Sequence, residues 1–181
     1  MSSSFPLSNA TYISGAFKVT GERVVGKDVA VTLTITNLTC NCKAINVNIT
    51  AFSILYTNKE MHQLLNETRK LCLKGKEEKE VPLTIKYAQY EDLLTADNMI
   101  EVHAVCSSEE TNEKLVVETN IVLENPKFEI KVCGSVKAKG TITIPVTFTP
   151  YKEGERYLLA DFTCNKFKNI KGHLEINVQP E

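Results

Sequence analysis

The segment Val29-Ala-Val-Thr-Leu-Thr-Ile-Thr-Asn37 decides the fold, because its apolar and polar side chains alternate with a period of two. Successive side chains of a β-strand point to opposite faces, so the aliphatic residues of this segment share one face and its threonines the other. The segment therefore predicts a half-buried strand whose aliphatic face lies on a core.

The same alternation recurs outward from this segment in both directions. It predicts strands at residues 12–19, 29–35, 45–51, 81–87, 100–106 and 115–123. The apolar phase switches between Ala51 and Phe52, which predicts a β-bulge at that point. Two segments depart from the pattern: Met61–Cys72 has apolar residues at helical spacing, and residues 90–97 predict a short helical turn.

A proline divides the series of strands in two. Asn125-Pro126 predicts a linker, because proline cannot donate to a strand ladder and restricts the residue before it. A second series follows, with strands expected at 128–132, 142–148, 157–162 and 174–178, and Pro145 places the second of these at a sheet edge. We therefore expect an all-β protein of two antiparallel, immunoglobulin-like sandwiches in tandem, over residues 12–124 and 127–181.

Composition and charge exclude several classes of function. Of the 181 residues, 43% are hydrophobic and 24% are charged, which rules out a wholly disordered chain. Lys and Arg number 21 against 22 Asp and Glu, so no basic excess is available to bind nucleic acid. No apolar run approaches the roughly 20 residues of a membrane span, and Met1–Leu7 does not resemble a secretory signal. We therefore expect a cytoplasmic protein.

The even number of cysteines, six, is compatible with a disulfide framework, but a chain of this length does not need disulfides to be stable. The expected cytoplasmic location favours free, reduced thiols instead. Four Asn-x-Ser/Thr triplets, at Asn9, Asn37, Asn48 and Asn66, would be glycosylation acceptors in a secreted protein. In a strand-rich chain with many Asn and Thr residues, we interpret them as chance.

No motif in the chain predicts a catalytic or metal site. His103 and Cys106 are three residues apart on an expected strand, so they point to opposite faces and cannot form a dyad. Cys40-x-Cys42 is the strongest metal motif, but no second Cys or His pair supplies the remaining ligands of a zinc site. We expect no catalytic residue, metal or cofactor in this chain.

A further set of motifs spans roughly residues 12–181. It comprises Val24–Val29, Ile35–Thr39, Asn46–Ala51, Ile54–Tyr56, Ile85–Glu91, Asp97–Ile100, Leu123–Pro126 and Leu158–Phe167. These motifs resemble the two C-terminal β-barrels of animal transglutaminases, most closely those of the epidermal type. The resemblance does not extend to the family's papain-like core, which carries its Cys, His, Asp and calcium ligands.

The resemblance implies a non-catalytic module that acts through protein contacts. In the family these barrels pack on the catalytic core and cover its active site in the latent state. The implied partner is a transglutaminase core or a second copy of this chain. The alternative is a fragment or isoform of a calcium-dependent protein-glutamine gamma-glutamyltransferase, and a third hypothesis is an extracellular adhesion module.

Two residues of this chain match positions with a known role in the family. Tyr56 matches the tyrosine of the first barrel that reaches the catalytic cysteine in latent family members, although an ordinary strand tyrosine explains it equally well. Thr119 stands where nucleotide-binding members have an arginine, and a threonine cannot grip phosphate with two charged hydrogen bonds. The second barrel is also shorter than in the family, with middle strands missing between about Val132 and Gly140.

Overall fold

The computed structural model describes residues 12–111, 113–127, 136–150 and 153–179. The chain divides into two compact units, Met1–Phe128 and Glu129–Glu181, and each is described by itself. In the part of the chain that is described, no helix has the length and apolar character needed to cross a membrane.

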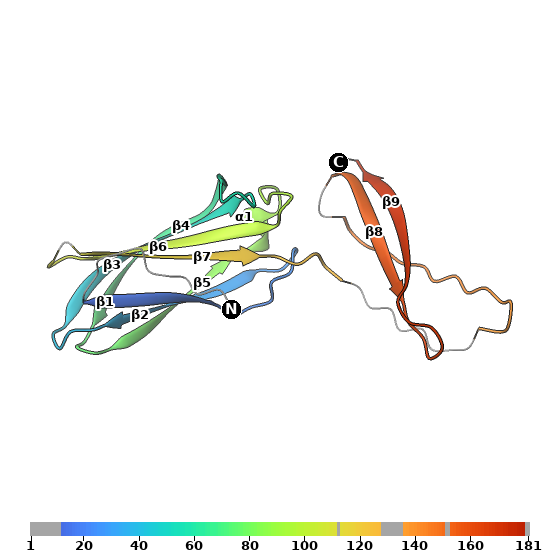
Figure 1. Cartoon of the computed structure of the whole chain (residues 1–181). Coiled ribbons are helices and arrows are strands. Elements are labelled where there is room, and N and C mark those ends of the chain that lie inside the picture. The colour runs from blue at the N-terminus through green and yellow to red at the C-terminus, as the bar shows by residue number, and fades with distance from the viewer. Residues whose placement is uncertain (1–11, 112, 128–135, 151–152, 180–181) are drawn as a thin grey trace. The chain divides into compact units, whose positions relative to one another are not determined.

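The first unit is a two-sheet antiparallel sandwich, which confirms the predicted all-β class (Figure 1). Its strands are β1 (Ile13–Val19), β2 (Val29–Asn37), β3 (Lys43–Ile54), β4 (Glu60–Leu73), β5 (Glu78–Ile85), β6 (Met99–Ser108) and β7 (Lys114–Val122). One sheet has the strand order β1-β2-β5 and the other the order β4-β3-β6-β7. A parallel bridge between Val24 and Glu124 adds a link between the β1–β2 connection and the segment after β7.

The core lies between the two sheets and is built by the alternation seen in the sequence. The four inward-facing residues of β2 are no more than 1% exposed; they are Val29, Val31, Leu33 and Ile35. The inward-facing residues of the central strands β3 and β6 are equally buried; they include Ile45, Val47, Ile49, Ile100, Val102 and Ala104. Burial of this much branched aliphatic surface, at about 25 cal/mol per Å², is the main force that holds the sandwich together.

The helix predicted at Met61–Cys72 is wrong, because this segment lies within strand β4. β4 pairs along its length with β3, from Lys43 opposite Leu73 to Ile54 opposite Glu60. The helical spacing arose because Leu64 and Leu65 are consecutive buried residues, which disrupts the period of two. Pairing with a central strand outweighs a local pattern of this kind.

The predicted bulge is present, but the change of face comes later than expected. The register between β3 and β4 shifts between Ala51 and Phe52 and again between Ser53 and Ile54. Burial keeps its original phase as far as Ser53, and only then does Ile54 fall on the buried side. Phe52 therefore lies on the outer face of the sheet, with its ring edge-on to His103.

A short helix is present next to the turn predicted at residues 90–97, but it shares only Tyr90 with that range. This helix is α1 (Tyr87–Tyr90), so Tyr87 starts a helix instead of ending strand β5. Tyr90 is completely buried and packs edge-on against Tyr87, with ring centres 5.3 Å apart. This turn connects the two sheets.

The described part of the second unit contains one hairpin, β8 (Gly154–Phe162) paired with β9 (Ile170–Val178). These strands confirm two of the four that the sequence predicts. The strand expected at 142–148, with Pro145 at an edge, is wrong: residues 136–150 form neither strand nor helix. The strand expected at 128–132 lies entirely outside the described residues.

The hairpin leaves apolar side chains exposed on one face. Leu158 lies opposite Leu174, and Phe162 opposite Ile170. Leu174 is 58% exposed and Phe162 52% exposed. A two-stranded hairpin has no second sheet to cover such a face, which is why isolated hairpins are marginally stable.

Candidate functional site

Tyr56 lies at the tip of the hairpin that joins β3 to β4. The loop is closed by hydrogen bonds from the Leu55 N–H to the Lys59 carbonyl at 3.0 Å and from the Asn58 N–H to the Leu55 carbonyl at 2.9 Å. Asn58 adopts a left-handed backbone with φ 60, which asparagine tolerates in turns. The side chain of Tyr56 is 77% exposed, so it does not serve the core of this unit.

Other segments of the sandwich hold this hairpin in place. The backbone N–H of Tyr56 donates to Asp97 Oδ2 at 2.9 Å. The hydroxyl of Thr95 donates to the Ile54 carbonyl at 2.7 Å, and the Asn120 amide donates to Asn58 Oδ1 at 3.4 Å. Side chains from two other parts of the chain, the connection between α1 and β6 and strand β7, thus fix the position of the tip.

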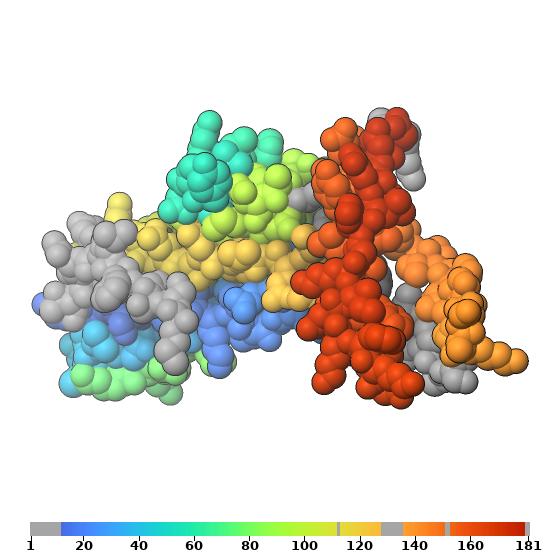
Figure 2. All heavy atoms as spheres, turned by 45° about the vertical axis from the view of Figure 1, so that its right-hand side comes forward, coloured from blue at the N-terminus to red at the C-terminus, as the bar shows by residue number. Residues whose placement is uncertain are grey.

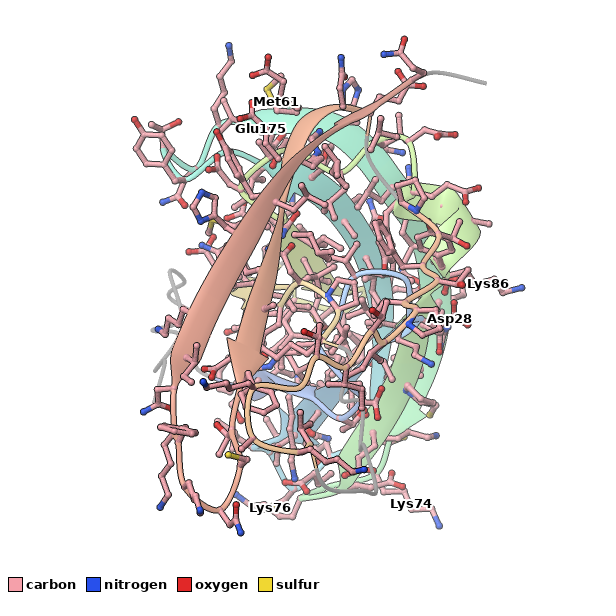
Figure 3. All side chains as sticks on the ribbon, turned by 90° about the vertical axis from the view of Figure 1, so that its right-hand side faces the viewer. Asp28, Met61, Lys74, Lys76, Lys86 and Glu175 are labelled. Carbon is pink, nitrogen blue, oxygen red and sulfur yellow. The ribbon has the colours of Figure 1, made fainter. Side chains whose placement is uncertain are left out.

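Exposed apolar side chains accompany Tyr56 at this end of the four-stranded sheet. Met61, the extra residue of the second register shift, is 43% exposed, and Val122 of β7 is 53% exposed. Figure 2 shows the teal segment around residues 55–65 projecting from the first unit, and Figure 3 labels Met61 on the side of this unit opposite Lys76. We name Tyr56, Met61 and Val122 the Tyr56 surface.

Thr119, the second position singled out by the sequence, lies on β7 opposite Val102 of β6. Its side chain is half-buried and shares its face of the strand with the core residues Val117 and Ile121. The residue therefore contributes a single hydroxyl on the inner side of the sheet. That Thr119 cannot replace the nucleotide-binding arginine stays a prediction from the family resemblance.

The structure confirms that His103 and Cys106 face opposite sides of β6. Cys106 is completely buried in the core, and that burial raises its pKa from 9.0 to about 12. His103 lies on the outer face of the sheet. A thiol that stays protonated and is separated from the nearest histidine by the sheet cannot act as a nucleophile.

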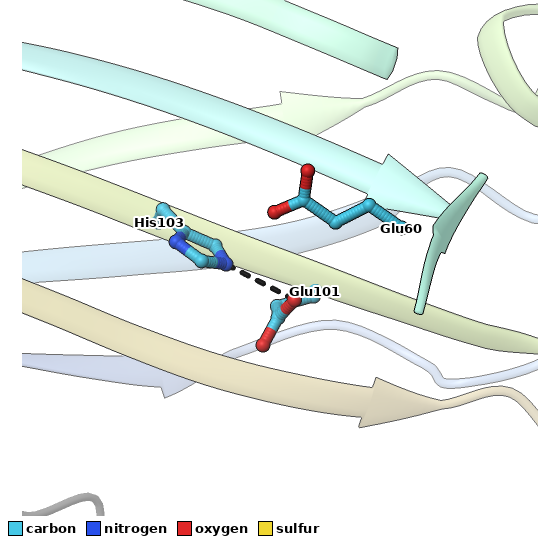
Figure 4. Close-up of side chains that lie close together, drawn as sticks. All are labelled: Glu60, Glu101 and His103. Carbon is cyan, nitrogen blue, oxygen red and sulfur yellow. Dashed lines mark ion pairs between the residues drawn. The ribbon is translucent and has the colours of Figure 1, made fainter. Parts of the chain in front are cut away.

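One cluster of side chains with metal-binding donors was missed by the sequence analysis. Glu60 from β4 and Glu101 and His103 from β6 bring their donor atoms within 4.8 Å of one another (Figure 4). His103 Nε2 lies 3.1 Å from Glu101 Oε2, although this buried nitrogen makes no hydrogen bond of good geometry. The ion pair accounts for the closeness of Glu101 and His103, and Glu60 is exposed, so the cluster by itself defines no metal site.

Only part of this cluster could have been found from the sequence. Glu101 and His103 are two residues apart on a predicted strand, a spacing that places both side chains on one face. Glu60 joins them through the pairing of β3 with β4, and the sequence had assigned most of that partner strand to a helix. Neither the register nor the partner strand could be read from spacing alone.

The fold defines the class of protein: an immunoglobulin-like antiparallel sandwich followed by a second, shorter β unit. The family description "Transglutaminase family, C-terminal ig like domain" matches residues 13–117, more than half of the chain. The chain therefore belongs to the transglutaminase family, which confirms the resemblance drawn from its motifs.

The curated relatives are much longer than this chain. Protein-glutamine gamma-glutamyltransferase E of Homo sapiens is 31% identical, over 92% of this chain and 30% of its own length. Protein-glutamine gamma-glutamyltransferase 6 of Homo sapiens is 37% identical over the same shares. The chain thus spans about 30% of the length of these relatives and corresponds to their C-terminal domain region.

A solved structure shares the fold. Red sea bream transglutaminase superimposes with a TM-score of 0.59 at 16% identity, over 96% of this chain and 32% of that protein. The alignments with the curated relatives run over 210 positions, whereas this chain has 181 residues. They must therefore include positions at which this chain has no residue.

Proposed function

We propose that these 181 residues form a non-catalytic module that acts by binding another protein, with the Tyr56 surface as its contact. The single observation that carries the proposal is an aromatic side chain, 77% exposed, at the tip of a hairpin that the rest of the sandwich holds in place. An exposed tyrosine of this kind is a typical anchor of protein interfaces.

The hairpin is suited to binding because most of its ordering is complete before a partner arrives. The bond from the Tyr56 N–H to Asp97 and the bond from Thr95 to the Ile54 carbonyl already fix the backbone that leads into Tyr56. The bond from the Asn58 N–H to the Leu55 carbonyl closes the turn after it. Association then immobilises only the tyrosine side chain, which has two rotatable bonds. Met61 and Val122 add exposed apolar area at the same end of the four-stranded sheet, which supports a contact that excludes water.

Family membership suggests the partner and its effect. The partner is a transglutaminase catalytic core or, as the second choice, another copy of this chain. On a core, the module would cover the active site with Tyr56 directed toward the catalytic residues. We propose that this occurs in the cytoplasm, the location that the sequence predicts, where exposed cysteines are reduced in the resting state.

The test measures binding of the full chain to a transglutaminase E from which the two C-terminal barrels have been removed. We expect saturable binding, and Tyr56→Ala should weaken it by tenfold or more, since interface tyrosines commonly contribute about 2 kcal/mol. Tyr157→Ala is the matched control, because Tyr157 is 62% exposed and lies in the second unit. Equal affinities for the wild type and Tyr56→Ala, or no binding, would overturn the proposal.

The alternative function is that of a piece of a calcium-dependent cross-linking enzyme. It is favoured by the curated relatives, which are named protein-glutamine gamma-glutamyltransferases and extend well beyond the matched region. Amine incorporation into a glutamine-bearing protein, with calcium present, tests whether these residues are catalytic by themselves. We expect no turnover above a heat-killed control; turnover would show that the chain is catalytic in its own right.

A further inference from the structure

The thiols of Cys42 and Cys72 face each other at the end of the sandwich opposite the Tyr56 surface. Their sulfur atoms are 3.2 Å apart, and both residues are exposed. Cys42 precedes β3, and Cys72 is the next-to-last residue of β4. Between this pair and Met61 lies roughly 35 Å of strand, at about 3.3 Å per residue, so the two sites are physically separate.

Strand pairing and a buried side chain bring the two sulfurs together. In the β3–β4 ladder Ala44 is opposite Cys72 and Lys43 is opposite Leu73, which leaves Cys42 diagonal to Cys72. The amide of Asn37, which is completely buried, donates to the Asn41 carbonyl at 2.8 Å and to the Lys74 carbonyl at 2.9 Å. One side chain therefore ties the chain before Cys42 to the chain after Cys72.

Two further contacts hold the turns on which the pair depends. The backbone N–H of Lys76 donates to the Thr39 carbonyl at 2.8 Å. Gly75 lies so close to the Cys40 carbonyl that a Cβ atom at this position would collide with it. The backbones that carry the two thiols are thus fixed relative to each other, which raises the effective concentration of one sulfur at the other.

We propose that Cys42 and Cys72 are a thiol pair that is converted to a disulfide by exchange with a low-molecular-weight disulfide such as glutathione disulfide. The thiolate of one cysteine attacks a sulfur of the small disulfide, the S–S bond breaks, and one small thiol leaves. The second cysteine then attacks the resulting mixed disulfide and releases the second small thiol. Two protein thiols are oxidised and one small disulfide is reduced to two thiols.

The surroundings of the pair allow this reaction. A shallow hollow of about 210 Å³ adjoins Cys72 and is lined in part by Ala44, Lys70 and Glu109, which gives a small disulfide room to approach. The hydrogen bond with Cys72, followed by desolvation and the charges of Cys72, Glu110 and Glu77, raises the pKa of Cys42. Exchange should therefore speed up as the pH rises, because only the thiolate attacks.

A disulfide fits the pair better than a metal ion does. A structural zinc site needs four ligands, and two thiolates supply half of them. Among the described residues, the cluster of Glu60, Glu101 and His103 is the only group of three donors with metal-binding spacing, and it contains neither cysteine. Cys106 is buried in the core, so it does not compete with the pair in the folded first unit.

The experiment equilibrates the reduced full chain with glutathione buffers of increasing disulfide content, blocks free thiols, and maps peptides without reduction. We expect a Cys42–Cys72 bridge to be the principal product. Its formation should raise the melting temperature of the first unit by about 5 °C or more, because it closes residues 42–72 into a covalent loop.

The matched variants are Cys42→Ser, Cys72→Ser and, as a control, Cys40→Ser, which removes an exposed thiol two residues away. The first two should lose both the bridge and the rise in melting temperature, whereas Cys40→Ser should keep both. A map in which Cys40 replaces either partner, or in which Cys42 ends as a stable mixed disulfide with glutathione, would overturn the proposal.

Discussion

The phenolic hydroxyl of Tyr90 donates a hydrogen bond to the carbonyl oxygen of Lys27 at 2.6 Å and accepts one from the Gly26 N–H at 3.2 Å. Tyr90 is completely buried, and Gly26 has a positive φ of 93, which a side chain would strain. One hydroxyl from α1 therefore satisfies two backbone groups of the turn that leads into β2.

Tyr90→Phe should destabilise the first unit by about 1 kcal/mol, because it removes two part-buried hydrogen bonds to the backbone. Urea unfolding followed by circular dichroism measures the change. Tyr87→Phe is the matched control, since it removes a hydroxyl from the neighbouring ring of the same helix. A loss of stability no larger than that of the control would show that the hydroxyl of Tyr90 contributes little.

Asn37→Ala should destabilise the first unit by about 2–3 kcal/mol, because it deletes the several hydrogen bonds of a completely buried side chain. Besides its amide bonds, Asn37 Oδ1 accepts from the Thr39 backbone N–H at 3.0 Å and from its hydroxyl at 2.8 Å. Chemical unfolding should give this variant a clearly lower free energy of unfolding than Asn48→Ala. Asn48 is the control because its side chain is exposed on β3. Comparable midpoints for the two variants would contradict the expectation.

The same burial predicts where glycans can attach if the chain is expressed through a secretory pathway. Asn37 belongs to an Asn-x-Thr triplet, but its amide nitrogen is already engaged in the interior. We expect glycosylation at the exposed Asn48 or Asn66 and none at Asn37 in folded material. Glycopeptide mapping tests this, and a glycan on Asn37 would mean that modification preceded folding or that the network is absent.

The first unit should lose stability between about pH 9 and pH 12. Burial raises the pKa of Cys106 from 9.0 to about 12, and desolvation raises that of Tyr90. The unfolded chain releases these protons at lower pH than the folded chain, so stabilisation is complete below pH 9 and is lost as the pH rises. Cys106→Ala should lower the free energy of unfolding at neutral pH but make its decrease between pH 9 and pH 12 smaller. An equal decrease in the wild type and the variant would show that other groups cause it.

The hairpin of the second unit should exchange its amide hydrogens faster than the strands of the first unit. Residues of β8 and β9 have no covering sheet among the described residues, whereas β2 and β5 border a closed core. In dilute solution we expect exchange faster by about two orders of magnitude. Equal protection in β8 and β2, measured by mass spectrometry, would show that the second unit is a complete domain.

The sequence predicted those strands whose alternation is regular. β2 and β6 were predicted because each buries every second side chain without interruption. β4 was not predicted, since Leu64 and Leu65 are both buried and the half-buried pair Glu67 and Arg69 takes up inward positions that would otherwise be apolar. The strand at 142–148 was predicted from alternation alone, and alternation does not supply a pairing partner.

The two side-chain groupings described above depend on β4. Cys72 reaches Cys42, and Glu60 reaches Glu101, only through the pairing of β3 with its neighbours. Spacing along the sequence carries no information on such register. Tyr56 was identified by family resemblance, and its position at an exposed hairpin tip became clear only from the fold.

The exposed apolar face of the β8–β9 hairpin affects how long the protein survives in a cell. Chaperones and proteases act on uncovered apolar strands, so chains with this face open are removed faster than chains with it covered. Leu174 and Phe162, each more than half exposed, lie on that face. We therefore expect the abundance of the protein to follow the supply of whatever surface covers the hairpin more closely than the rate of its own synthesis.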